Sequence, residues 1–71
     1  MANRARQIAK LHEKAAALSD EFDELWVEMS ESFDNMPENL QDGEKGEIMQ
    51  SRIDRIEEVR DVLTDFAEEE L

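Results

Sequence analysis

Apolar residues recur through the first half of the chain at alternating steps of three and four. The series comprises Ile8, Leu11, Ala15, Leu18, Phe22, Leu25 and Met29. This spacing is the a/d seam of a heptad repeat and predicts a helix that packs on a second helix. The second half has its own apolar series at helical spacing: Met49, Ile53, Ile56, Val59, Leu63 and Phe66. No segment alternates with a period of two, so we expect an all-α fold.

Between the two series lies the segment SFDNMPENLQDGEKGE, which holds the only proline and both glycines. Pro37 lacks a backbone donor and disfavours helical angles at Met36, so the first helix should end before it. Asp42 can cap the second helix. Proline also suits the first position of a helix, which leaves open one isolated turn over residues 37–41. The sequence predicts a single domain, 1–71, with a helix over about 4–34, a bend over 35–42 and a helix over about 43–69.

We expect the two helices to form an antiparallel coiled-coil hairpin. In the register that brings Met29 opposite Met49, Phe22 falls opposite Ile56, and the basic first residues lie beside the acidic C-terminal ones. A hairpin of this size buries little apolar surface and is marginal alone.

The seam also leaves large apolar residues uncovered. With Phe22 at an a position, Trp26 and Phe33 fall at e, and Val27 falls on the outer face. We therefore predict a homodimer that forms a four-helix bundle and buries an apolar patch of Trp26, Val27 and Phe33. The alternative is that this patch binds a different protein.

Composition narrows the possible functions. The chain has 20 acidic and 8 basic residues, a net charge of −12 and no cysteine, which excludes disulfides and zinc sites built on sulfur. No apolar run follows the first residues, MANRARQIAK, so we expect no signal peptide. No stretch approaches the roughly 20 apolar residues of a membrane span. We expect a cytoplasmic protein without a membrane partner.

The residues that carry chemistry are few. His12 is the only histidine, and no serine lies in a sequence that would activate it, so we expect no enzyme and no catalytic residue. The carboxylates of the bend do not match the spacing of an EF-hand loop, so we expect no metal and no cofactor. The only basic cluster, residues 1–14, should face carboxylates, which argues against direct binding of nucleic acid.

The most informative feature is the distribution of acid residues, because no basic residue occurs between Ala15 and Glu44. Stripes of carboxylates follow the outer surface of both helices, about 4.5–6 Å apart along the axis. We interpret this acidic face as a mimic of a nucleic-acid strand that binds a protein with a basic groove. The alternative is a solvated face that keeps the protein soluble. The predicted face comprises Asp20, Glu24, Glu28, Glu31, Asp34, Asp54, Glu58, Asp61 and Asp65.

The run FDNMPENLQDGEKGE followed by SRIDRIEEVRDVL resembles a segment of small acidic helical proteins of phages and prophages, over residues 33 to about 63. The resemblance implies a phage accessory protein, acting in the host cytoplasm. Together with the acidic face it suggests a non-catalytic inhibitor of a host nucleic-acid-binding defence protein, of the anti-CRISPR or anti-restriction type. The alternative is a small coiled-coil adaptor or assembly factor that binds protein partners through the apolar patch.

Overall fold

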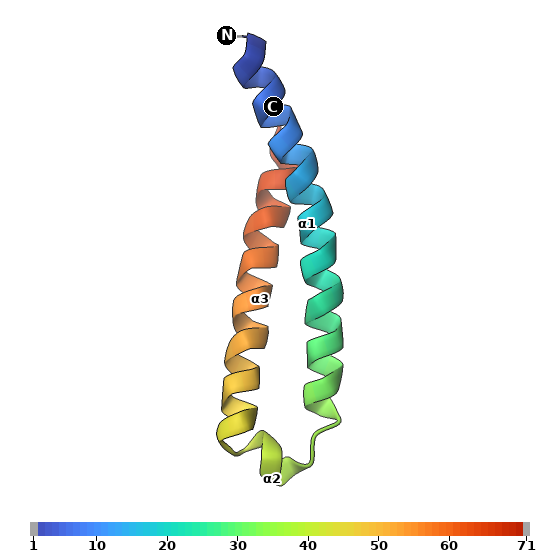
Figure 1. Ribbon diagram of the computed structural model, residues 1–71, viewed down its shortest axis with the longest axis vertical. Helices are drawn as coiled ribbons and strands as arrows, with labels where there is room; N and C mark the ends of the chain where they lie inside the picture. Colours follow the sequence, from blue (N-terminus) through green and yellow to red (C-terminus); the bar gives the residue numbers. More distant parts are fainter. Residues whose placement is uncertain (1, 71) are drawn as a thin grey trace.

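The computed structural model describes residues 2–70 and contains two long helices joined through a short one. These are α1 (Ala2–Asp34), α2 (Glu38–Gln41) and α3 (Glu44–Glu68). The described residues include no strand, so the predicted all-α class is confirmed. Helices α1 and α3 lie side by side and run in opposite directions, with both chain ends at one end of the molecule and α2 at the other (Figure 1).

The bend is held by hydrogen bonds from one side chain. Backbone carbonyls at the C-terminal end of a helix have no partner within the helix. Gln41 supplies one, since its Nε2 donates to the carbonyl of Phe33 at 2.8 Å and to that of Met36 at 3.1 Å. Pro37 begins the short turn of α2, and its carbonyl accepts from the backbone N–H groups of Leu40 and Gln41. The isolated turn left open by the sequence is therefore α2.

Gly46 lets α2 pack directly on the first turns of α3. It is buried, and a Cβ at this position would lie 2.1 Å from the carbonyl oxygen of Gln41. Any other residue would push the two backbones apart. This contact sets where the chain reverses direction, and hence how α3 is aligned with α1.

The alignment of the helices differs from the predicted register by about one helical turn. Asp23 lies opposite Arg60, with 2.9 Å between Oδ1 and Nη1, and His12 Nε2 lies 2.8 Å from the carbonyl of Glu69. The predicted register placed Phe22 opposite Ile56. The predicted register centred the reversal of the chain on Asn39. In the structure, the packing of α2 on Gly46 moves the centre of the reversal toward Gln41.

The face of α1 that meets α3 also differs from the predicted seam. Leu11, Leu18 and Leu25 were expected inside, yet they are 55%, 42% and 42% exposed. Helix α1 is rotated so that another set of residues lies buried or half-buried between the helices. This set is His12, Ala15, Ser19, Phe22, Trp26, Met29, Ser30 and Phe33. The small side chains of Ala15 and Ser19 allow the two helices to approach closely. Nearer the bend, the large rings of Trp26 and Phe33 fill the space between the helices.

The core of the pair is thin. Ala15 and Ile53 are the buried apolar residues, and among the described residues no large side chain is fully buried. The molecule measures 57 × 16 × 15 Å, so it is a single layer of two helices. Each helix therefore has a second side that α1–α3 packing leaves open.

Candidate functional site

The helix pair has two broad faces of opposite character, here called the polar face and the apolar face. The polar face contains two shallow grooves between α1 and α3. The terminal groove is lined by Ala16, Ser19, Asp20, Asp23, Arg60, Asp61, Thr64, Ala67 and Glu68. The bend groove is lined by Trp26, Ser30, Phe33, Asp34, Gln50, Ile53, Asp54 and Glu57. Both helices contribute carboxylates to both grooves, and Arg60 is the only basic residue in the two sets.

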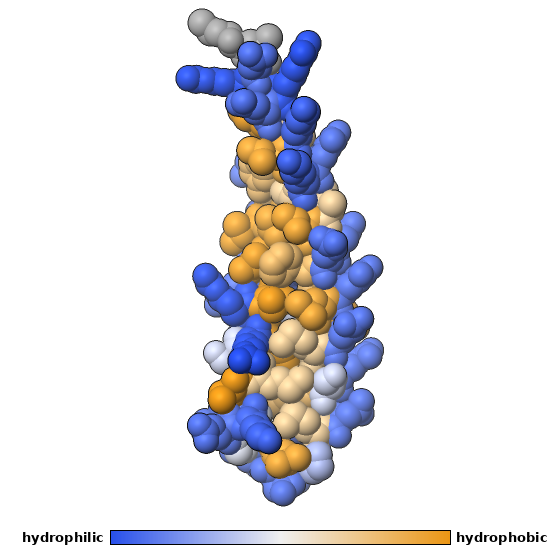
Figure 2. Space-filling model, viewed as in Figure 1, coloured by the Kyte–Doolittle hydropathy of each residue, from blue (hydrophilic) through white to orange (hydrophobic). Residues whose placement is uncertain are grey.

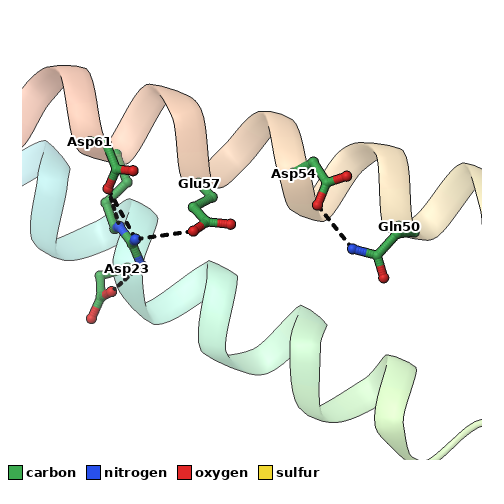
Figure 3. A network of polar contacts seen from close by, with 6 residues as sticks. Asp23, Gln50, Asp54, Glu57 and Asp61 are labelled. Atoms are coloured by element: carbon green, nitrogen blue, oxygen red, sulfur yellow. Dashed lines mark hydrogen bonds and ion pairs between the residues drawn. The ribbon is translucent and has the colours of Figure 1, made fainter.

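Arg60 joins the two helices on the polar face. Figure 3 shows the carboxylates of Asp23, Glu57 and Asp61 connected by dashed contacts between two neighbouring helices. Arg60 Nη1 donates to Asp23 Oδ1 on α1 at 2.9 Å, and its Nη2 donates to Asp61 Oδ1 on α3 at 3.0 Å. Glu57 Oε1 lies 3.9 Å from Nη2. One guanidinium thus binds Asp23 and Asp61 through hydrogen bonds and lies within ion-pair distance of Glu57.

These contacts favour the charged form of the Arg60 guanidinium, which is ionised at neutral pH in any case. The pKa of its guanidinium lies above the ordinary value, chiefly because it donates to Asp61, with a further rise from Asp23 and an opposing effect of burial. A folded-state pKa above the unfolded value stabilises the fold at every pH below that unfolded value. The contribution is lost only as the pH rises through the raised pKa, which lies in strong alkali.

Trp26 lies beneath Arg60, with the guanidinium carbon 5.0 Å from the centre of its ring. This distance is within the range of a cation–π contact. The indole Nε1 is buried and has no hydrogen-bond partner among the described residues. Trp26 therefore packs in the bend groove through its ring alone.

All nine residues of the predicted acidic face are exposed, but they do not form one surface. Asp20, Asp34, Asp54 and Asp61 line the grooves of the polar face. Glu58 lies on the other side of the pair, beside Val59 and Val62. The remaining members line neither groove: Glu24, Glu28, Glu31 and Asp65.

The sequence interpretation missed two carboxylates of the polar face. Asp23 of α1 and Glu57 of α3 line the grooves together with Arg60. Each lies next to the true interhelical seam, at a position that the assumed seam had turned away from the partner helix. A seam of α1 drawn through Ser19, Trp26 and Phe33 would have found Asp23.

The predicted apolar patch is divided in the structure. Trp26 and Phe33 are half-buried and line the bend groove against α3 of the same chain. Val27 is 40% exposed and lies outside that groove. Whether these residues contact another protein stays a prediction, but they do not present one continuous exposed surface.

The apolar face lies on the opposite side of the pair and was not singled out from the sequence. Its central residues are Leu11, Leu18 and Leu25 of α1 and Val59, Val62 and Phe66 of α3. Figure 2 shows this face as a hydrophobic band along the molecule, bordered on both sides by hydrophilic side chains. Large exposed apolar bands of this kind mark sites of protein association.

Within residues 2–70, no group of three or more His, Cys, Asp or Glu side chains is arranged to hold a metal ion. In the same part of the chain, no helix combines the length and apolar character needed to cross a membrane.

Comparisons with protein-family models, with curated proteins and with solved structures found no match.

Proposed function

We propose that this protein is a non-catalytic interaction protein whose polar face binds the basic groove of a nucleic-acid-handling protein and blocks it. In the phage setting that the sequence resemblance suggests, the target is a host defence protein of the CRISPR or restriction type. The observation that carries the proposal is the composition of the two grooves. They are lined by seven carboxylates from two helices and by a single base, Arg60.

The arrangement of these carboxylates supports mimicry of a nucleic-acid strand. Asp20 and Asp23 follow one helix, and Asp54 and Asp61 follow the other, so the charges form two rows rather than one cluster. Helical residues three or four positions apart lie about 4.5–6 Å apart along the axis. Rows at such intervals suit a groove lined with Arg and Lys, where charge complementarity speeds association and fixes orientation.

Rigidity adds to this argument. The rows lie on long helices, and Arg60 ties Asp23 of α1 to Asp61 of α3. Carboxylates already held in place lose less conformational entropy when a partner binds. A flexible acidic tail of equal charge would lose more.

The predicted coiled-coil hairpin and its homodimeric four-helix bundle belong to the same proposal. If two copies meet through their apolar faces, both polar faces remain on the outside of the bundle. One dimer then presents two identical acidic surfaces.

Two variants with equal changes of charge test the proposal. The polar-face variant replaces Asp20, Asp34, Asp54 and Glu68 with Lys, and the matched control replaces Glu24, Glu31, Glu58 and Asp65 with Lys. All eight positions are exposed, and Lys is a good helix former, so both variants should keep their helical circular dichroism. Each protein is immobilised and offered a bacterial lysate. We expect the control to retain the nucleic-acid-binding proteins that the original captures and the polar-face variant to lose them. Equal capture by both variants would contradict the role of the polar face.

The second candidate function is a coiled-coil adaptor or assembly factor. The observation in its favour is the apolar face, on which Leu18, Leu25 and Val62 are exposed. Salt separates the two candidates. Binding through the polar face should weaken steeply as NaCl rises from about 50 to about 500 mM, whereas an apolar contact should change little.

A further inference from the structure

The apolar face exposes several large hydrophobic side chains. Leu18 and Leu25 are each 42% exposed, and Val62 is 68% exposed. All three belong to a helix pair that has no second layer on this side (Figure 2). The polar face, on the opposite side of the pair, exposes mainly Arg60 and the carboxylates around it.

The exposed area indicates how much surface a second layer would cover. The chain exposes 5800 Å². A compact monomer of 8.3 kDa would expose about 4,600 Å². The excess, about 1,200 Å², comes from the elongated shape of the helix pair. Burial of part of it against a second copy would supply the roughly 800 Å² per partner that a standard stable interface buries.

The charged residues along the two edges of this face identify the partner. The α1 edge has Lys14 near the chain ends and Glu21 and Glu28 nearer the bend, each one turn from Leu18 or Leu25 and all exposed. The α3 edge has the reverse order, with Lys45, Arg52 and Arg55 nearer the bend and Glu69 near the chain ends. At matching heights, Glu28 thus has the opposite charge to Arg55, and Lys14 the opposite charge to Glu69, while Glu58 on the α3 edge pairs with Arg55 of its own helix.

We propose that a second copy of this chain covers the apolar face, related by a two-fold axis that runs along the helices. Such an axis keeps every residue at its own height and lays α1 of one copy across α3 of the other. Asp23 and Arg60 lie at one height within a chain. Glu28 comes five residues after Asp23, and Arg55 comes five before Arg60, so Glu28 meets Arg55 of the second copy. By the same count Lys14 meets Glu69.

The assembly is a four-helix bundle in which every neighbouring pair of helices is antiparallel. Its inner layer is formed by Leu18, Leu25, Val59 and Val62, while Trp26 stays within its own chain. A two-fold axis across the helices would instead stack α1 on α1 and separate Glu28 from Arg55. The inference specifies the arrangement of the dimer that belongs to the proposed function, and its tests are independent of what the polar face binds.

Light scattering on purified protein tests the occupant of the face. We expect the unmodified protein to have the mass of two chains. Leu25→Glu or Val62→Glu should raise the dissociation constant of the dimer at least about a hundredfold, because each buries a charge in the interface. The matched control is Val27→Glu. Val27 is 40% exposed, an exposed fraction similar to the 42% of Leu25, but it lies outside the apolar face. A monomer at all concentrations for the original protein would overturn the proposal and favour another protein as occupant. So would a dimer that Val27→Glu alone disrupts.

A disulfide test fixes the orientation and does not depend on a folded disruptive variant. The chain contains no cysteine. Chains carrying Glu28→Cys are mixed with chains carrying Arg55→Cys and oxidised, and we expect a disulfide-linked dimer of one chain of each kind. The control pairs Glu28→Cys with Asp54→Cys, because Asp54 is adjacent to Arg55 but lies on the polar face. Equal cross-linking in both mixtures, or none in either, would overturn the proposed two-fold arrangement.

Discussion

The guanidinium carbon of Arg60 on α3 lies 5.0 Å from the centre of the Trp26 ring on α1. The same guanidinium donates to Asp23 on α1 and to Asp61 on α3. Arg60 therefore packs on the ring of Trp26 and also forms an ion pair between the two helices. This contact joins the packing of the pair to the charge of its polar face.

Replacing Arg60 with Gln should lower the melting temperature by several degrees and shift Trp26 fluorescence to longer wavelength. The variant removes the stem that covers the ring and the donors that bind two carboxylates. The melting temperature of Arg60→Lys should lie between those of the original protein and Arg60→Gln. An ammonium group keeps the charge but lacks the planar guanidinium that donates to two carboxylates at once. The control is Arg6→Gln, because Arg6 is exposed near the chain ends and lies outside the contacts of Arg60. If Arg60→Gln and Arg6→Gln melt alike, the contact does not stabilise the pair.

Replacing Trp26 with Phe should cost much less than replacing it with Ala. The buried Nε1 has no partner among the described residues, so Phe removes an unpaired donor while keeping a ring under Arg60. Trp26→Ala should lower the free energy of unfolding by about 2–3 kcal/mol, somewhat less than for a fully buried aromatic residue. Urea denaturation followed by circular dichroism measures both, since both variants lack the tryptophan signal. Equal losses would indicate that Nε1 makes a hydrogen bond that stabilises the fold.

Gly46→Ala should destabilise the bend far more than Gly43→Ala. The added methyl group at position 46 would meet the Gln41 carbonyl oxygen, a backbone atom that cannot move alone, and we expect a loss of about 1–3 kcal/mol. At Gly43 the nearest atom outside its neighbours is 3.4 Å away, so the change should stay within about 0.5 kcal/mol. Thermal melts of the two variants provide the comparison. A tolerated alanine at position 46 would show that α2 does not pack on α3 in solution.

Added NaCl should raise the melting temperature by a few degrees at neutral pH. The net charge is −12, and mobile ions screen the repulsion among exposed carboxylates more than they weaken the partly buried contacts of Arg60. The comparison is made at constant pH and constant protein concentration. A melting temperature that falls steadily with NaCl would show that attractive ion pairs outweigh the repulsion.

The sequence predicted the helices well but not the side of α1 that meets α3. Periodicity and the helix-breaking residues around Pro37 place α1 and α3 within two residues of the expected bounds. Helix α1, however, has three adjacent apolar stripes, one through Leu18 and Leu25, one through Ala15 and Phe22, and one through Trp26. A single partner helix covers only two of them, and periodicity alone does not decide which.

The polar face was predictable only in part for the same reason. Individual carboxylates such as Asp20 and Asp61 could be recognised as members of outer stripes. The contact of Arg60 with Asp23 could not, because it joins residues far apart in the chain and depends on the register. That register follows from how α2 packs on Gly46, a contact between backbones that leaves no periodic signal in the sequence.

The most direct test of the proposed function is competition between this protein and DNA for a captured target. Lysate proteins are bound to the immobilised chain at fixed ionic strength, and duplex DNA or a neutral polymer is then added. We predict that DNA releases the bound nucleic-acid-binding proteins, that the neutral polymer does not, and that the polar-face variant captures none of them. Bound proteins that DNA fails to release, or that the polar-face variant captures equally well, would contradict mimicry by the polar face.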